Sequence, residues 1–121
     1  MRIAADIVSS WPENQLPETT EKREGFIMFT GLRSGIEDAE LTGIVRDHDL
    51  RRLKAMEEHL SSIIKEKRLK YPLAEIRLEF TEQYRNMGPV IAKYPKVMAN
   101  LISAVKRTGL TPRIKPVRGG T

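Results

Sequence analysis

Apolar residues recur at steps of three and four along residues 50–70, and this stripe is the clearest pattern in the chain. Its members are Leu53, Met56, Leu60, Ile63 and Ile64, with charged and polar residues between them. Such spacing places apolar side chains on one face of a helix. Asp49, just before the stripe, has the side chain of a helix N-cap, and Tyr71-Pro72 ends the pattern. The sequence therefore predicts a long helix that packs on one side.

Two shorter stretches show the same helical spacing. Ile3, Ile7, Val8 and Trp11 predict a helix over residues 2–11, which Pro12 ends. Val97, Met98, Leu101, Ile102 and Val105 predict a further helix. It begins at Pro95, because a first helical turn tolerates proline, and ends near Gly109. Residues 12–25 are polar and predict a loop.

Runs rich in β-branched and aromatic residues predict strands. Residues 26–32 and 39–47 are two such runs, and the polar, glycine-containing stretch between them predicts a hairpin. Ile76, Leu78 and Phe80 alternate with Glu75, Arg77 and Glu79, which is typical of a strand with one solvated face. Residues 111–118 contain Pro112 and Pro116, so we expect a sheet edge or a segment outside any ladder. The predicted order, α-β-β-α-β followed by α-β, is that of an α+β fold.

The composition excludes several kinds of site. The 121-residue chain has no cysteine, so it forms neither a disulfide nor a thiolate metal site, which fits a cytoplasmic protein. Its two histidines, His48 and His59, have no second pair of ligands at metal-binding spacing. No apolar run approaches the roughly 18 residues that span a membrane. We therefore expect a chain without a zinc site of its own and without a membrane partner.

The net charge of +5 raises the question of nucleic-acid binding. The basic residues, however, are interleaved with acidic ones, as in residues 21–24 and 65–68. No motif interleaves aromatic residues with the basic groups. Mixed signs of this kind are typical of a solvated surface, so we expect no nucleic-acid interface.

Four segments contain residues that packing alone does not require. They are Leu16-Pro17-Glu18-Thr19-Thr20-Glu21 leading into Glu24-Gly25-Phe26, Ile44-Val45-Arg46-Asp47-His48-Asp49, Tyr84-Arg85-Asn86-Met87 and Pro116-Val117-Arg118-Gly119-Gly120-Thr121. Arg46, Asn86 and Arg118 lie near the ends of predicted elements, so they can converge on an anionic group through charge-assisted hydrogen bonds. Gly119 and Gly120 let the backbone approach a ligand closely.

Each of these three polar residues also has a local explanation. Arg46 can form an ion pair with the neighbouring Asp47 or Asp49. Asn86 can hydrogen-bond its own backbone in a turn. Arg118 can lie in a solvated terminus. No single segment decides between binding and these local roles.

Together, in this order and at these separations, the segments resemble the peptidase T family of tripeptide aminopeptidases. That family lies within the zinc-dependent dipeptidase and aminoacylase-type metallopeptidases. The resemblance rests on Pro-Glu-x-Thr-Glu with Glu-Gly-Phe, on Ile-x-Arg-Asp-x-Asp before a long helix, on Tyr-x-Asn-Met after a strand, and on Pro-x-Arg-Gly-Gly-Thr. It runs through nearly the whole chain, and the last motif is the most specific.

The resemblance implies an incomplete lid, or dimerisation, domain over residues 1–90 and the start of the returning catalytic-domain segment over residues 91–121. The lid would be a ferredoxin-like two-layer sandwich, with two helices on one face of an antiparallel sheet. It would lack the first lid strand and be followed by an added C-terminal helix and extended segment. Because that strand is central in such a sheet, its absence leaves unpaired edges, which recruit partners. We therefore expect the chain alone to be marginally stable, to aggregate, or to close the gap with another segment or a second copy.

The resemblance also implies roles for individual residues. Arg46 and Arg118 would hold the C-terminal carboxylate of a tripeptide, Asn86 would assist, and Gly119 and Gly120 would supply the loop backbone. The parent enzyme would be a cytoplasmic hydrolase of peptide catabolism with two zinc ions. The family's zinc ligands and general base do not lie in this chain, so it would bind no metal and be inactive alone. Its partners would be the substrate, the rest of the catalytic domain, and a second copy bound through the lid.

Two other hypotheses stand beside this one. The chain can be a free-standing α+β interaction module that dimerises through its sheet edge and has no catalytic activity. An interface well above about 1,000 Å² would favour that hypothesis. It can also be a basic nucleic-acid-binding domain, whose affinity would fall steeply with salt.

Overall fold

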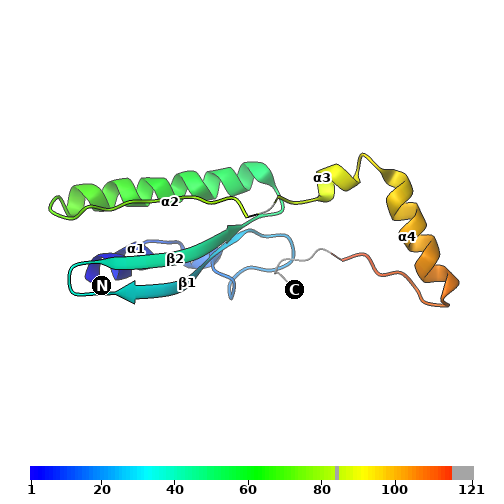
Figure 1. The fold of residues 1–121 in the computed structure, drawn as a ribbon, viewed down its shortest axis with the longest axis horizontal. Coiled ribbons are helices and arrows are strands. Elements are labelled where there is room, and N and C mark those ends of the chain that lie inside the picture. Colours follow the sequence, from blue (N-terminus) through cyan, green and yellow to red (C-terminus); the bar gives the residue numbers. More distant parts are fainter. Residues whose placement is uncertain (84, 116–121) are drawn as a thin grey trace. The chain divides into compact units, whose positions relative to one another are not determined.

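The structure is a computed structural model that describes residues 1–83 and 85–115. Contacts divide the chain into two units, the first covering residues 1–79 and the second beginning at Phe80. The first unit contains α1 (Arg2–Ser9), the short 3-10 helix η1 (Glu13–Gln15), β1 (Phe26–Ser34), β2 (Ala39–Arg46) and α2 (Leu50–Lys70) (Figure 1). The second contains α3 (Gly88–Ile91) and α4 (Pro95–Arg107).

Strands β1 and β2 form the antiparallel hairpin that the sequence predicted. Phe26 pairs with Arg46 at the open end of the hairpin. The register shifts between Phe29 and Gly31, so one strand carries an extra residue there. The pairing places the start of β1 beside the end of β2, which brings the Glu24-Gly25 segment near the residues that follow Arg46.

The helices of the first unit also follow the predicted patterns. Asp49 is the N-cap of α2, because its Oδ1 accepts hydrogen bonds from the backbone amides of Arg51 and Arg52 at 2.8 and 3.2 Å. The helix ends at Lys70, directly before Tyr71-Pro72. Both predictions about the ends of α2 are therefore confirmed.

The core of the first unit lies between the helices and the hairpin. It consists of Trp11, Ile27, Met56, Leu60 and Ile63, with Leu16, Phe29, Val45 and Leu78 packed against it. The predicted apolar stripe of α2 supplies three of these core members, and Ile64 is buried as well. α1, α2 and β2 contact one another, and Figure 1 shows α2 running alongside the hairpin. The unit is therefore a small α+β domain with a layer of helices and a layer of strands, as predicted.

One charged residue lies where the sequence indicated only solvated charges. Lys67 belongs to the mixed-charge stretch of residues 65–68, yet only 3% of it is exposed. Its ammonium group lies 3.3 Å from the Asp6 carboxylate on α1. Burial of a lysine requires such a partner, and the sequence pattern did not reveal one 61 positions away.

The strand predicted over residues 76–80 does not form, and this prediction was wrong. In the described part of the chain the sheet has two strands, β1 and β2, which pair only with each other. The segment still alternates between half-buried and exposed side chains, although it forms no ladder of backbone hydrogen bonds. Ile76 and Leu78 are half-buried, whereas Glu75, Arg77 and Glu79 are exposed. The Ile76 carbonyl accepts a hydrogen bond from Arg68 Nε at 2.8 Å. A strand needs a neighbouring strand to satisfy its backbone groups, and this segment has none.

The second unit has little interior of its own. α4 begins at Pro95, as predicted, and Gly109 follows it with a positive φ of 81°, which suits a helix end. No residue of α4 is buried, and Val97 and Leu101 are 58% and 57% exposed. Its apolar face is therefore largely uncovered within this unit.

None of the helices in residues 1–83 and 85–115 combines the length and the apolar character that crossing a bilayer requires. The longest, α2, has charged residues throughout its 21 residues. Its buried apolar residues form the stripe that covers the core, whereas Leu50 and Leu69 at its two ends are exposed.

Candidate functional site

Arg46, the first of the predicted binding residues, is the last residue of β2 and is half-buried. It pairs across the hairpin with Phe26. Only Asp47, His48 and Asp49 separate it from α2. The side chain therefore starts from a strand-to-helix junction, at the strand end that the sequence predicted.

Asp47, the residue after Arg46, is held by α2. Arg52 Nε lies 3.1 and 3.0 Å from the two Asp47 carboxylate oxygens, and Arg52 Nη2 lies 2.9 Å from Oδ1. The amide of Asp49 donates a further hydrogen bond to Asp47 Oδ1 at 2.7 Å. Only 2% of the Asp47 side chain is exposed. A carboxylate with this many charge-assisted bonds is fixed in position.

Gly25 packs against the same carboxylate. A Cβ atom at position 25 would lie 2.2 Å from Asp47 Oδ2 and 2.8 Å from Asp47 Cγ, so no larger residue fits without moving Asp47. Arg52 Nη2 also donates a hydrogen bond to the Arg23 carbonyl at 3.1 Å. The loop before β1 is thus tied to the junction after β2.

The hydrogen bonds at this junction stabilise the charged forms of Asp49 and Arg52. The backbone amides of Arg52 and Arg51 lower the pKa of Asp49, because they stabilise its carboxylate. The hydrogen bond from Arg52 to Asp47 raises the pKa of Arg52. Both carboxylates that flank His48 therefore have partners on α2, and the Arg52 guanidinium offsets the negative charge of Asp47.

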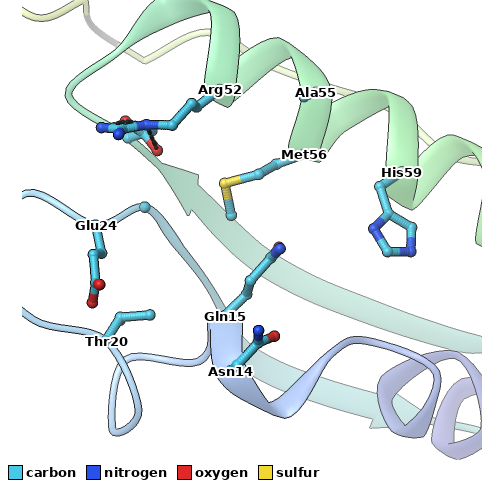
Figure 2. Close-up of a pocket in the computed structure, with 10 residues that line it drawn as sticks. Asn14, Gln15, Thr20, Glu24, Arg52, Ala55, Met56 and His59 are labelled. Carbon is cyan, nitrogen blue, oxygen red and sulfur yellow. Dashed lines mark hydrogen bonds and ion pairs between the residues drawn. The ribbon is translucent and has the colours of Figure 1, made fainter.

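A cleft of about 440 Å³ opens beside this junction, between the loop before β1 and α2. Figure 2 shows Arg52, Met56 and His59 along α2 on one side and Gln15, Thr20 and Glu24 on the other, with Gln15 pointing toward Met56 and Glu24 pointing away from α2. The lining mixes polar and apolar groups. The ring of His59 contacts Trp11 with centroids 5.1 Å apart and planes tilted by 37°, while His59 itself remains exposed.

Asn86, the second predicted binding residue, lies just before α3 in the second unit and is exposed. Its side-chain Oδ1 accepts a hydrogen bond from the Gly88 amide at 2.9 Å. This is the turn contact that the sequence offered as the local explanation. The neighbouring Arg85 forms an exposed ion pair with Glu82 at 2.6 Å.

The third predicted binding residue, Arg118, lies outside the described residues, as do Gly119 and Gly120. Among the residues that the structure describes, no group of three or more histidine, cysteine, aspartate or glutamate side chains could hold a metal ion. Within the described residues, the candidate site is the junction of Arg46, Asp47 and Arg52 with the adjoining loop.

Sequence reasoning identified the two segments of this junction but not the contact between them. Arg52 was not singled out, because it reads as one of several basic residues at the start of α2. Gly25 was noted only as part of a motif. A glycine directly before a strand and an arginine three residues after an N-cap are the signals that could have suggested the contact.

Comparison with known proteins finds relatives that share the name peptidase T. A protein named peptidase T from Fusobacterium nucleatum is 34% identical over 119 residues, which are 98% of this chain and 29% of the relative. Peptidase T from Alkaliphilus oremlandii is 34% identical over 121 residues, covering 100% of this chain and 30% of the relative. A peptidase T-like protein from Rhizobium meliloti is 29% identical over 119 residues. No family model matches the chain.

These relatives are peptidases by name, and the similarity extends over the whole chain. The chain is homologous to a segment of peptidase T, in agreement with the resemblance seen in its motifs. It spans 29–30% of the length of these relatives.

Proposed function

We propose that this chain is the part of a peptidase T-like enzyme that anchors the C-terminal carboxylate of a tripeptide, with Arg46 as the principal described anchor. The observation that carries the proposal is the placement of Arg46 at a rigid strand-to-helix junction. The match to peptidase T along the whole chain supports it. An anchor at a fixed distance from the scissile bond would let the enzyme measure substrate length.

In this proposal the chain has two parts with different roles. Residues 1–90 would form the lid, and residues 91–121 would return to the catalytic domain. Arg118, with the backbone of Gly119 and Gly120, would hold the same carboxylate as Arg46, and Asn86 would assist. The uncovered apolar face of α4 supports a return to a larger domain, because a helix with an apolar stripe is stable when that stripe is buried.

Peptide bond hydrolysis would take place elsewhere in the enzyme. The resemblance implies two zinc ions, but the described residues offer no cluster that fits a metal. In this proposal the contribution of this chain is to bind and orient the substrate. We place the parent enzyme in the cytoplasm, where it would degrade short peptides.

Substitution of Arg46 by alanine in a full-length peptidase T that carries the same arginine tests the proposal. Two substrates should be compared, a tripeptide with a free carboxylate and the same tripeptide with a C-terminal amide. A hydrogen bond to a charged group contributes about 1.5–3 kcal/mol, so kcat/KM for the free acid should fall about 10- to 150-fold. The fall should come mainly from a higher KM, and the amide should change little.

The control is Arg33→Ala, because Arg33 is an exposed arginine on β1 of the same hairpin. This variant should leave the ratio of acid to amide activity unchanged. Equal losses for acid and amide in Arg46→Ala would show a general defect instead. Unchanged kinetics would refute the assignment of Arg46.

One observation favours a second role, that of dimerisation. In the described residues the sheet has only two strands, so each strand has an outer edge without a partner in the sheet. Such edges pair readily with another chain. A homodimer through the lid would use them, and it would be compatible with carboxylate binding at Arg46.

A further inference from the structure

We infer that Gly25, Asp47 and Arg52 form a clasp that positions Arg46 for binding the substrate carboxylate. The three residues would be positioning residues, because they act through Arg46 and do not touch the substrate. This inference rests on the proposed function of Arg46. It gives a role to Gly25 and Asp47, which the motifs contain without a stated role, and it adds Arg52 to the site.

The clasp joins the two sequence segments that flank the open end of the hairpin. Gly25 directly precedes Phe26, and Asp47 directly follows Arg46. The contact between Gly25 and Asp47 therefore lies next to the Phe26–Arg46 pair at the open end of the hairpin. Asp47 Oδ2 packs against the Gly25 backbone, where a Cβ would lie at 2.2 Å. The backbone of Arg46 is thereby held from its own strand and from the loop before the partner strand.

Arg52 fixes the clasp from α2. Its guanidinium contacts Asp47 through Nε at 3.0 Å and Nη2 at 2.9 Å, and it reaches the Arg23 carbonyl at 3.1 Å. A planar fork bound to a carboxylate at two points restricts both position and rotation. Only 2% of the Asp47 side chain is exposed, so the carboxylate end of these bonds is shielded from water, whereas 58% of the Arg52 side chain is exposed.

Arg52 also has an electrostatic role at this junction. An unpaired Asp47 carboxylate beside Arg46 would repel an incoming substrate carboxylate. The guanidinium of Arg52 offsets that charge. The clasp would thus set both the geometry and the local charge around the anchor.

The experiment uses the same full-length enzyme and the same pair of substrates as the Arg46 test. Arg52→Gln should raise KM for the free-acid tripeptide and lower the acid-to-amide ratio of kcat/KM. The decrease in kcat/KM should not exceed that of Arg46→Ala. Misplacement of a binding group by about 1 Å can lower the rate roughly a hundredfold. Arg52→Lys keeps the charge but not the fork, so it should restore part of the ratio.

Arg51→Gln is the matched control, because Arg51 is the exposed neighbour with the same charge on the same helix. Gly25→Ala tests the geometry without any change of charge, since the added methyl group must displace Asp47. Its control is Gly35→Ala in the hairpin turn, where the nearest atom is the Oδ1 of an exposed aspartate, Asp38, that can rotate away. Gly25→Ala should lower the acid-to-amide ratio, and both controls should preserve it.

The outcomes separate the two proposals. If Arg46→Ala collapses the ratio while Arg52→Gln and Gly25→Ala leave it unchanged, the clasp is refuted and the anchor stands. If Arg46→Ala itself leaves the acid-to-amide ratio unchanged, the proposed function of Arg46 is refuted, and the clasp inference, which rests on it, is refuted with it. Where Arg52→Gln fails to fold, Arg52→Lys and Gly25→Ala decide the question, because a purely structural defect would lower acid and amide activity equally.

Discussion

The Lys67 ammonium group lies 3.3 Å from Oδ2 of Asp6, and this contact joins α2 to α1. Lys70 Nζ and Tyr71 Oη also donate to that oxygen, at 2.9 and 3.0 Å. Only 4% of the Lys67 side chain is exposed. A single carboxylate on the first helix therefore satisfies three groups from the end of the long helix, one of them buried.

This cluster predicts a specific dependence of stability on pH. The hydrogen bond from Lys70, with smaller contributions from Tyr71 and Lys67, lowers the pKa of Asp6 from 3.8 to about 2. A depressed pKa in the folded state means that the stabilisation is complete above pH 3.8 and is lost as the pH falls towards about 2. The difference in thermal midpoint between the wild type and Asp6→Asn should therefore be largest above pH 3.8 and shrink below it.

The measurement is thermal unfolding of both proteins across that pH range at one protein concentration. Other carboxylates also titrate there, so only the difference between the two proteins is informative. A difference that stays constant down to pH 2 would show that the negative charge of Asp6 does not contribute to stability.

Ile27 should be the most sensitive single apolar position, because it is only 1% exposed and belongs to the core. Ile27→Ala removes packed methyl groups and leaves a cavity, which costs about 2–5 kcal/mol in the free energy of unfolding. Urea unfolding followed by the fluorescence of Trp11, the single tryptophan, would measure it. Ile36→Ala is the control, since Ile36 is fully exposed in the hairpin turn and should change the free energy by less than about 0.5 kcal/mol.

The two long helices should differ strongly in amide hydrogen exchange. α2 buries five residues, whereas α4 buries none and has 13 residues, a length at which isolated helices are marginal in water. In the chain alone, we expect slow exchange for the central amides of α2 and fast exchange throughout α4. Equal protection of the amides in both helices from exchange would show that the apolar face of α4 is covered within this chain. That result would contradict the proposal that residues 91–121 return to a catalytic domain.

The open hairpin should make the chain associate. Each of the two described strands has an edge without a partner strand, and the segment of residues 76–80 lacks a ladder. Association that covers these edges stabilises the folded state by mass action, so the thermal midpoint should rise with protein concentration. Sedimentation velocity would detect the associated species. A sharp, cooperative transition in a monomer at every concentration would contradict this expectation.

The candidate site was predictable only in part. The motif around Arg46 identified the strand end, and the structure places Arg46 there. For Asn86 the structure shows the local turn contact with Gly88, and its part in substrate binding stays a prediction. The sequence offered signals for the contact of Arg52 and Gly25 with Asp47 but did not establish it, because the contact depends on how the hairpin meets α2.

The sequence by itself determined the local elements, namely the hairpin, α2 with its N-cap at Asp49, and α4 from Pro95 to the turn at Gly109. These depend on apolar period, caps and prolines, which act over neighbouring residues. Only the tertiary structure decided which charges pair and which extended segment becomes a strand. Lys67 pairs with Asp6 in another helix, Arg52 reaches the Arg23 carbonyl 29 positions away, and the Ile76–Leu78 segment has no partner strand. Which groups pair in this way depends on how the elements pack in space, and the pattern of neighbouring residues does not contain that information.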